Sequence, residues 1–236
     1  MSSYHLSRVL SNDLIGESVR HLVISTPEPI PYQAGQFFLM RLRDTEGNYV
    51  ERSYSVANFD ENGELRFVIR IDSKGHMSQL INALIPGDPV DIKGPFGHFG
   101  YQSLPELPQK LVLIAGGVGI SPFYSMAQHS FLKQESFPIQ LFYGFRRPDD
   151  YLFRTELEGF AEAPRLQIFP AISEEGEYPD WNGKRGYIGD CLDGDIFPPE
   201  PGTHCYICGP PVMVKATRDK LFELGFDRHH IHVEAW

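Results

Sequence analysis

The stretch Leu111-Val-Leu-Ile-Ala-Gly-Gly-Val-Gly-Ile-Ser-Pro122 decides the fold of the second half of the chain. Its first five residues are apolar and predict a buried strand, and the closing proline is typical of the first turn of a helix. The glycines between them allow a ligand to approach the backbone closely, and the free amides at a helix start favour a phosphate. The pattern is typical of a dinucleotide-binding domain. It is not the strict G-x-G-x-x-G spacing, so a glycine turn that serves only tight packing remains an alternative.

Strand-like and helix-like segments alternate from here to the C-terminus. Strands are expected at Leu111–Ala115, Ile139–Tyr143, Leu166–Phe169 and Cys205–Cys208, and helices at Pro122–Lys133, Asp149–Phe160 and Pro211–Leu224. The strands are apolar on both faces, which predicts a parallel sheet covered by helices on both sides.

A second strand end with glycine and proline follows at His204-Cys-Tyr-Ile-Cys-Gly-Pro-Pro211. In an open α/β sheet the ligand lies outside the carboxyl ends of the strands, so both turns are expected to face one crevice, with Cys208 at its edge. Three other interpretations of Cys208 stay open. It is an inert buried thiol, half of a redox pair with Cys205, or a zinc ligand together with a histidine from the 229–232 segment.

The first half has a different pattern. Short apolar runs at Phe37–Leu42, Tyr49–Val56, Leu65–Ile71 and Val90–Ile92 are separated by turn residues and predict an antiparallel sheet with one helix, at Gly75–Ile85. The prolines of Leu104–Gln109 mark a linker. We therefore predict two domains, residues 1–103 and 104–236.

Two short segments of the first half carry groups that could bind a ligand. Arg52-Ser-Tyr-Ser55 offers a charge, a ring and hydroxyls, and Gly75-His-Met-Ser78 opens the predicted helix. These are the groups that a flat, phosphate-bearing molecule needs. An ordinary exposed strand is the alternative for the first segment.

Composition limits the classes of function. The 236 residues have a formal net charge of −10, which disfavours a nucleic-acid partner. No apolar stretch approaches the ~18 residues of a membrane helix, and no leader pattern opens the chain, so a cytoplasmic protein is expected. Three cysteines are too few for a four-thiolate iron–sulfur cluster. No metal site is expected, and redox chemistry would need another cofactor.

The motifs taken in order resemble the ferredoxin–NADP reductase superfamily. They are Arg52-x-Tyr54-Ser55, Gly75-x-x-Ser78, Gly87-Asp88, Gly94-Pro95-Phe96-Gly97, Ala115–Pro122, Gly144-x-Arg146, Cys208-Gly209-Pro210 and Glu234-x-Trp236. The resemblance covers essentially the whole chain. It implies an antiparallel Greek-key flavin barrel followed by an α/β domain with a five-stranded parallel sheet for the nicotinamide dinucleotide. The most similar subgroup is the short bacterial NAD(P)H-dependent flavin, ferredoxin and oxygenase reductases without a fused iron–sulfur domain.

The resemblance also implies roles for individual residues. In the first domain it assigns Arg52 to the flavin pyrophosphate, Tyr54 to stacking on the isoalloxazine, and Ser55 to a hydrogen bond near flavin N5. Cys208 and Glu234 would flank the position of hydride transfer, so Ser55, Cys208 and Glu234 are the expected catalytic residues. The other cofactor-binding residues that it implies are Ser53, Gly75, His76, Met77, Ser78, Gly116, Gly117, Val118, Gly119, Arg146, Arg147, Gly209, Pro210 and Trp236.

Two positions need separate interpretation. Val118 stands where the family usually has threonine, so dinucleotide contacts are expected to rely more on backbone amides. After the Ile139–Tyr143 strand, Arg146 and Arg147 come before any carboxylate. They either accept a 2′-phosphate or form a solvated basic pair, which leaves NADH and NADPH both open.

The function implied is an FAD-dependent oxidoreductase. It would take hydride from NAD(P)H onto flavin N5 and pass electrons to a ferredoxin, flavodoxin or oxygenase-type acceptor. One alternative is a reductase that uses free flavin as its substrate, and another is a noncatalytic docking subunit of a larger redox complex.

Overall fold

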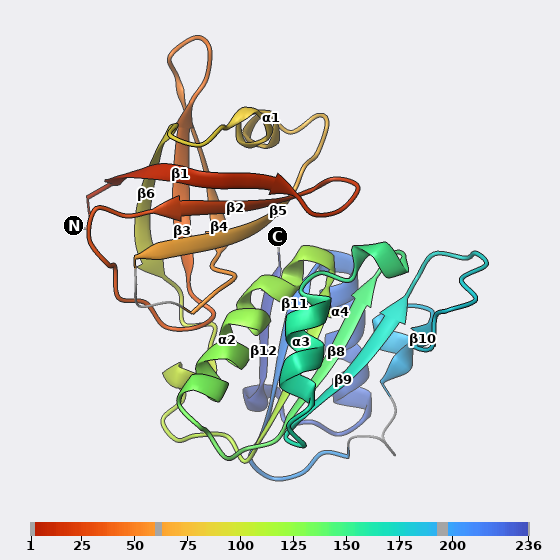
Figure 1. The fold of residues 1–236 in the computed structure, drawn as a ribbon. Helices are drawn as coiled ribbons and strands as arrows, with labels where there is room; N and C mark the ends of the chain where they lie inside the picture. Colours follow the sequence, from red (N-terminus) through yellow and green to blue (C-terminus); the bar gives the residue numbers. More distant parts are fainter. Residues whose placement is uncertain (1–2, 60–62, 193–197, 236) are drawn as a thin grey trace.

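The computed structural model describes residues 3–59, 63–192 and 198–235. Two six-stranded sheets, one formed before residue 97 and one after residue 109, lie next to each other (Figure 1).

The first sheet is antiparallel, with strand order β4-β3-β6-β1-β2-β5. Its strands are β1 His5–Leu14, β2 Val19–Ser25, β3 Phe37–Arg43, β4 Tyr49–Ser55, β5 Glu64–Arg70 and β6 Pro89–Phe96. Strand β6 lies between β3 and β1, as a Greek-key connection requires. The predicted antiparallel Greek-key domain is confirmed.

Alternation of side chains forms the core of this sheet. Along β3, Phe38, Met40 and Leu42 are buried, while the residues between them are less so. This is the two-residue period of a strand with one face on a core. Helix α1 (His76–Ala83) covers one end of the sheet and buries Met77 and Ile81. The predicted helix at Gly75–Ile85 therefore forms, one to two residues shorter at each end.

The second sheet is parallel, with order β10-β9-β8-β7-β11-β12. Its strands are β7 Lys110–Gly116, β8 Ile139–Phe145, β9 Leu166–Ile172, β10 Lys184–Arg185, β11 Thr203–Gly209 and β12 Ile231–Ala235. Helices α2 (Ser121–Leu132) and α3 (Arg154–Ala161) cover one face, and α4 (Pro211–Glu223) covers the other (Figure 1). The predicted parallel α/β domain is confirmed, but its sheet has six strands and not five. The additional strand, β10, has only two residues, which pair with Ala171 and Ile172.

Helix α3 begins later than predicted. The expected start was Asp149, but Pro148–Asp150 forms a short 3-10 helix and Phe153 adopts φ 56°. A left-handed residue cannot continue an α-helix, so α3 starts at Arg154.

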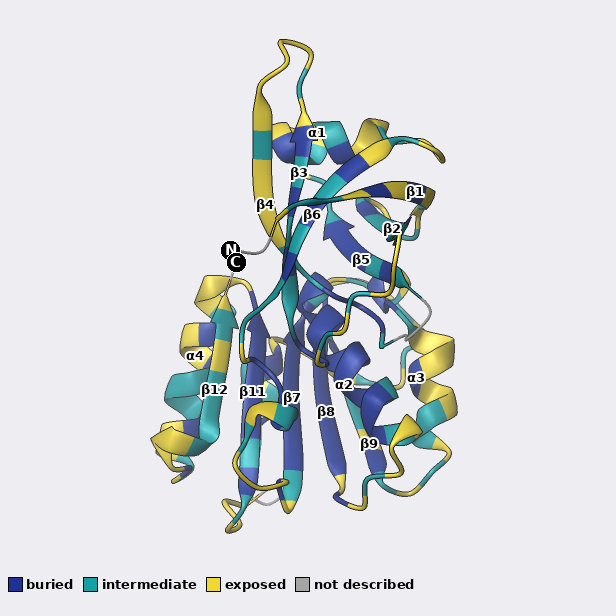
Figure 2. Ribbon diagram, turned by 90° about the vertical axis from the view of Figure 1, so that its left-hand side faces the viewer, coloured by how far each residue is buried: buried dark blue, intermediate teal, exposed yellow. Residues whose placement is uncertain are grey.

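The strands β7, β8 and β11 are almost entirely buried (Figure 2). One hydrophobic cluster joins them to the first sheet, because Val19, Ala57 and Val68 pack in the same core as Leu113 and Ala115. Since the two halves share this core, the domain boundary at residues 103 and 104 stays a prediction. No helix in the described ranges is long and apolar enough to cross a membrane.

Candidate active site

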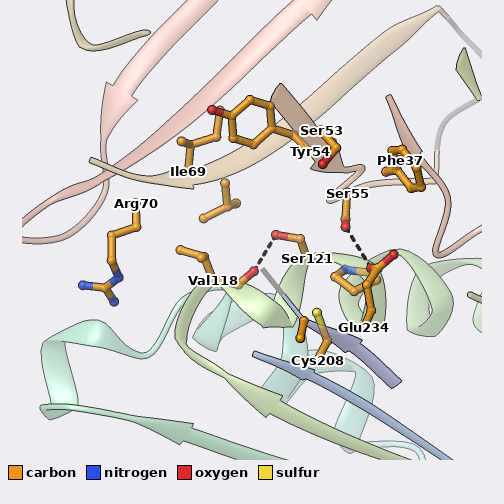
Figure 3. Close-up of a pocket in the computed structure, with 13 residues that line it drawn as sticks. Phe37, Ser53, Tyr54, Ser55, Ile69, Arg70, Val118, Ser121, Cys208 and Glu234 are labelled. Carbon is orange, nitrogen blue, oxygen red and sulfur yellow. Dashed lines mark hydrogen bonds between the residues drawn. The ribbon is translucent and has the colours of Figure 1, made fainter. Parts of the chain in front are cut away.

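A cleft of about 240 Å³ opens where the two sheets meet (Figure 3). Both sheets contribute to its wall, and the lining residues are Phe37, Ser53, Tyr54, Ser55, Val68, Ile69, Arg70, Val118, Ser121, Pro122, Cys208, Glu234 and Ala235. Six of the predicted site residues are therefore together in one place: Ser53, Tyr54, Ser55, Val118, Cys208 and Glu234.

The register of the parallel sheet sets the floor of this cleft. Cys208 is paired with Ala115 of β7 on one side and with Glu234 of β12 on the other. Because neighbouring strands lie about 4.8 Å apart, Cys208 and Glu234 are close neighbours at the carboxyl edge of the sheet. Cys208 is 1% exposed.

Ser55 and Glu234 connect the two domains across the cleft. The Ser55 hydroxyl donates a hydrogen bond of 3.2 Å to Oε2 of Glu234 (Figure 3). Burial raises the pKa of Glu234, and the hydrogen bond from Ser55 partly opposes that rise. The pair is therefore a partly buried site where a proton can be held next to a hydroxyl.

Tyr54 lies on the opposite wall of the cleft, near Ile69 (Figure 3). Burial raises the pKa of its hydroxyl to about 12, so the side chain is neutral at physiological pH. A neutral, partly buried ring at the mouth of a cleft is suited to stacking on a flat ligand.

The glycine turn after β7 is packed tightly against the turn after β11. A Cβ at Gly119 would overlap the carbonyl group of Cys208, and a Cβ at Gly116 would overlap the sulfur of Met213. Gly117 has φ +55°. Tight packing against the second turn is thus sufficient to require glycine at positions 116 and 119. A nucleotide contact by the same turn remains a prediction.

Two hydrogen bonds hold the shape of this turn. The hydroxyl of buried Tyr143 donates to the Gly117 carbonyl at 3.1 Å, and Ser121 donates to the Val118 carbonyl at 2.8 Å. Both carbonyls are thereby satisfied within the protein. The turn presents the apolar side chain of Val118 to the cleft.

A second candidate binding region lies at the start of α1. Gly75 precedes the helix, and among the described residues no side chain caps the amides of this first turn, which includes His76, Met77 and Ser78. The guanidinium of Arg52, on neighbouring β4, is exposed and donates to its neighbour's carbonyl. Free helix amides and an exposed arginine are the groups that bind a phosphate.

Arg146 and Arg147 follow β8 at the carboxyl edge, outside the cleft. Each forms an ion pair: Arg146 with Glu174 at 2.8 Å, and Arg147 with Glu17 of the first sheet's β1–β2 loop. Both ion pairs lie at the surface, with 58% of the Arg146 side chain exposed, so a solvated basic pair and a 2′-phosphate contact both stay predictions. Gly209 and Pro210 lead from β11 to α4, and Trp236 lies outside the described residues.

Several cleft residues were not predicted. Phe37, Arg70 and Ala235 line it, and nothing in the local sequence of Phe37 or Ala235 distinguishes them. A signal for Arg70 was its position at the end of a strand that leads toward the Gly75 turn. Arg70 lies close to Gly117, which belongs to the second domain, and this contact can be recognised only from the folded structure.

The redox-pair and zinc interpretations of Cys208 gain no support from the geometry, whereas its burial agrees with an inert thiol as well as with a place at the cleft. All three cysteines are free, and burial raises the pKa of Cys205 to about 12, which keeps it a thiol. No group of three or more His, Cys, Asp or Glu within residues 3–59, 63–192 and 198–235 is arranged to hold a metal ion.

Comparison with known proteins gives two family models. The Oxidoreductase FAD-binding domain matches residues 7–101, and the Oxidoreductase NAD-binding domain matches residues 113–219. The chain is 30% identical over 209 residues to NADH-cytochrome b5 reductase 2 of Meyerozyma guilliermondii, covering 86% of this chain and 70% of that one. It is 29% identical over 226 residues to the reductase component of phenol 2-monooxygenase from Pseudomonas sp., covering 94% and 62%.

Solved structures show the same fold. The cytochrome P450 reductase of Amycolatopsis superposes with a TM-score of 0.86 at 28% identity, covering 99% of this chain and 70% of that one. A ferredoxin NADP+ reductase from Neisseria gonorrhoeae, with bound FAD and NADP, superposes with a TM-score of 0.87 at 24% identity and covers 98% of both chains.

The residues present fit an FAD. The cleft offers a neutral ring and a hydroxyl for a flat heterocycle, and the uncapped start of α1 with exposed Arg52 offers donors for its pyrophosphate. The fold, the site and the relatives agree: the chain belongs to the ferredoxin–NADP reductase family and is an NAD(P)H-dependent flavoprotein oxidoreductase that uses FAD.

Proposed function

We propose that this protein accepts hydride from NAD(P)H at the cleft between its sheets and delivers electrons to a ferredoxin, flavodoxin or oxygenase-type acceptor. The observation that carries this proposal is the convergence of Tyr54 and Ser55 from the first sheet with Cys208 and Glu234 from the second. When bound, FAD supplies the hydride-accepting and electron-releasing chemistry. The protein supplies binding, orientation and a site shielded from water.

The first sheet holds the cofactor. Arg52 and the amides of Gly75, His76, Met77 and Ser78 bind the pyrophosphate, because they offer a positive charge and a helix N-terminus on neighbouring elements. Tyr54 stacks on the ring system. Ser53 and Ser55 supply hydroxyls, or backbone groups of β4, to its polar edge.

The second sheet orients the nicotinamide. Gly116, Gly117 and Gly119 let the dinucleotide backbone approach closely, and Val118 leaves that contact to main-chain amides. Cys208, followed by Gly209 and Pro210, would contact the nicotinamide from the carboxyl end of β11.

Glu234 and Ser55 manage the proton at the reacting edge. Because burial raises the pKa of Glu234, the carboxyl favours its protonated form more than an exposed glutamate does. Its hydrogen bond with Ser55 gives a path by which a proton can move between the domains' facing walls. Neither residue needs to act as a nucleophile.

The nature of the acceptor is supported by the relatives. Those named above include a cytochrome b5 reductase, an oxygenase reductase component and a cytochrome P450 reductase, all of which pass electrons to another protein. A protein redox partner is the class of acceptor that all three relatives support.

The test is the visible spectrum of the purified protein, recorded anaerobically while NADH and then NADPH are added. We expect a tightly bound flavin that bleaches with at least one nucleotide. A colourless protein that turns over added flavin would mean that flavin is a substrate. Bound flavin that neither nucleotide reduces would leave the docking-subunit alternative and overturn the proposal.

A further inference from the structure

Strand β12 forms one outer edge of the parallel sheet, where it pairs with β11 and with no other strand in the described ranges (Figure 2). Its register against β11 is unbroken from Ile231 to Ala235. No loop among the described residues exchanges backbone hydrogen bonds with it either. A strand that is paired on one side only presents a row of N–H and C=O groups that can pair with a further strand. The sheet therefore ends in an edge that can be extended.

This edge lacks the features that usually prevent strand edges from pairing. Proteins block such edges with lysine, proline, bulges or very short strands. The opposite edge of the same sheet follows that rule, because β10 consists only of Lys184 and Arg185, and both are exposed. Strand β12 has five residues, Ile231-His-Val-Glu-Ala235, without lysine, arginine or proline. Val233, in its middle, is 46% exposed. An unprotected edge with an exposed β-branched residue favours pairing.

The sequence of β12 is complementary to itself when two copies run antiparallel about a two-fold axis. An axis perpendicular to the sheet must pass through a residue, because directly opposite side chains point to the same face. With the axis at Val233, His232 of each copy faces Glu234 of the other. Ile231 then faces Ala235, so all five residues are paired. An axis at His232 or at Glu234 would set like groups opposite each other and pair fewer residues. The pattern favours one register, and its complement is a second copy.

His232 and Glu234 both have polar atoms left for such a pairing. Glu234 accepts from Ser55 at Oε2, and His232 Nε2 lies 3.0 Å from His204 Nδ1. Within the described ranges, Oε1 of Glu234 and Nδ1 of His232 have no hydrogen-bond partner. Opposite residues of antiparallel strands have their Cβ atoms about 4.5–5.5 Å apart. The imidazole of one copy can therefore donate from Nδ1 to the carboxyl of the other when its Nε2 accepts from His204.

The other face of β12 offers apolar surface to the same axis. Ile231 packs against the cluster that contains Val214 and Leu221 of α4, so Val233, two residues later, faces the same side. Phe222 of α4 is 45% exposed and adds apolar surface on this side. A perpendicular two-fold axis keeps both α4 helices on one face of the joined sheet. Pairing would withdraw the two Val233 side chains from water there.

We propose that this protein forms a two-fold symmetric dimer in which two β12 strands pair antiparallel, with Val233 on the axis. The two parallel sheets then join into one continuous sheet. The inference goes beyond the proposed function, because each copy places His232 beside Glu234 of the other copy, at the wall of the cleft. The imidazole donates to the carboxyl that Ser55 already holds.

The first test measures the mass of the FAD-loaded protein by sedimentation velocity across the micromolar range. We expect the wild type to pass from monomer to dimer as its concentration rises. Val233→Lys should weaken association at least about tenfold, because two lysines would face each other across the axis. Leu10→Lys is the matched control. Leu10 is 44% exposed on β1, which has neighbouring strands on both sides, so this variant should associate like the wild type.

Cross-linking tests the register with variants that keep the strand apolar. Val233→Cys brings one thiol from each copy to the axis, close enough for a disulfide. Oxidised glutathione should therefore give a covalent dimer on a non-reducing gel. Ala235→Cys is the control on the same strand, because its two thiols would lie about 14 Å apart in this register and should not cross-link. The wild type gives the background from its own three cysteines.

A monomer at every concentration, or unchanged association of Val233→Lys, would overturn the inference. Equal cross-linking yields for Val233→Cys and Ala235→Cys, including none for both, would exclude the register and overturn it as well. All of these readouts are masses. The flavin spectrum and its reduction by nucleotide test the proposed function separately, so either proposal can fail while the other stands.

Discussion

Arg52 shows how one exposed side chain can decide cofactor retention. Its guanidinium donates to the Glu51 carbonyl, and no carboxylate among the described residues pairs with it. It is thereby available to an anion, in contrast to Arg41, which is tied to Asp91 at 2.8 Å. An available arginine next to uncapped helix amides is a phosphate site built from two independent parts.

We expect Arg52→Ala to lose flavin during purification. A charge-assisted hydrogen bond to phosphate is worth about 1.5–3 kcal/mol, so the Kd for FAD should rise by roughly 10- to 100-fold. The measurement is the ratio of flavin to protein absorbance after gel filtration. Arg43→Ala, on the same hairpin, is the control and should keep its flavin. Stoichiometric flavin in Arg52→Ala would contradict the assignment.

Cys208→Ala should separate orientation from cofactor binding. The thiol lines the cleft from the second sheet and lies apart from the region predicted to hold the pyrophosphate. We expect flavin content to be unchanged, while the rate of flavin reduction by the preferred nucleotide falls roughly tenfold, equivalent to about 1.4 kcal/mol. Anaerobic stopped-flow absorbance measures that rate. An unchanged rate would show that Cys208 is an inert buried thiol.

At the scale of elements, the two turns after β7 and β11 behave as one packed unit. Gly119 lies directly against the backbone of Cys208, with no room for a side chain between them. The glycine turn therefore sets the position of the carboxyl end of β11 as well as its own.

Gly119→Ala tests this coupling. A methyl group there forces backbone apart, and overpacking of this kind costs about 1–3 kcal/mol in the free energy of unfolding. Urea unfolding measures the loss. Gly159→Ala is the matched control: it lies in α3 with nothing within 4 Å of the added Cβ, so it should stabilise the helix by about 0.5–1 kcal/mol. Equal stabilities for the two variants would refute the packing argument.

Strands β11 and β12 also carry a cluster of histidines. His204 Nδ1 and His232 Nε2 are 3.0 Å apart, and the ring of His230 is 4.4 Å from that of His204. Burial, together with His230 and His232, lowers the pKa of His204 from 6.5 to about 4. Folding therefore disfavours protonation of this cluster.

Stability from a neutral His204 is complete above pH 6.5 and is lost as the pH falls toward 4, because the unfolded chain binds the proton more tightly. We expect a loss of about 1 kcal/mol, after allowing for solvent screening of a partly exposed ring. Urea unfolding at pH 7.5 and 5 should show a smaller loss in His204→Asn than in the wild type. His98→Asn, an exposed control, should follow the wild type.

Local patterns predicted the elements where one physical signal dominates. Apolar runs located β7, β8 and β11, and prolines after glycines located the starts of α2 and α4. Strand β1 has only two buried residues, and β10 has only two residues in all, so neither leaves a hydrophobic period to detect. The start of α3 depends on the backbone of Phe153, a bulky residue in a conformation that its type disfavours.

For the whole molecule, the shared core makes the two sheets one cooperative unit. Phe99 and Tyr101, which lead out of the first sheet, pack in the same cluster as Phe123 of α2 and Tyr206 of β11. Buried His129 of α2 is hydrogen-bonded to the Tyr101 hydroxyl at this junction.

We therefore expect a single unfolding transition. If one half unfolded, the other half would lose its contacts in this shared core. Neither half should therefore stay folded when the other unfolds. Circular dichroism at 222 nm, flavin release and tryptophan fluorescence should give coincident urea midpoints. Two separated midpoints would show that the domains unfold independently. Tyr101→Phe should lower the free energy of unfolding by about 1 kcal/mol and shift all three midpoints to lower urea together.

The site as a whole was predictable only through family resemblance. Sequence pattern placed Cys208 at a crevice, and resemblance added Ser55 and Glu234, which lie together in the structure at 3.2 Å. Neither approach identified the partners of Arg146 and Arg147. Glu174 follows another strand and Glu17 belongs to the other sheet, so each pairing depends on strand order and not on local sequence.

The pairing of Ala115, Cys208 and Glu234 has one further consequence, for the evolution of the chain. Loops that connect these strands can lengthen or shorten freely, because their ends rejoin the same ladder. A shift of β12 by a single residue is different, since it would turn Glu234 to the other face and bring Val233 or Ala235 opposite Cys208. Descendants of this gene can therefore tolerate insertions around the strand but not a change in its phase. A shift of the last strand by an odd number of residues should therefore preserve the fold but remove Glu234 from its place beside Cys208.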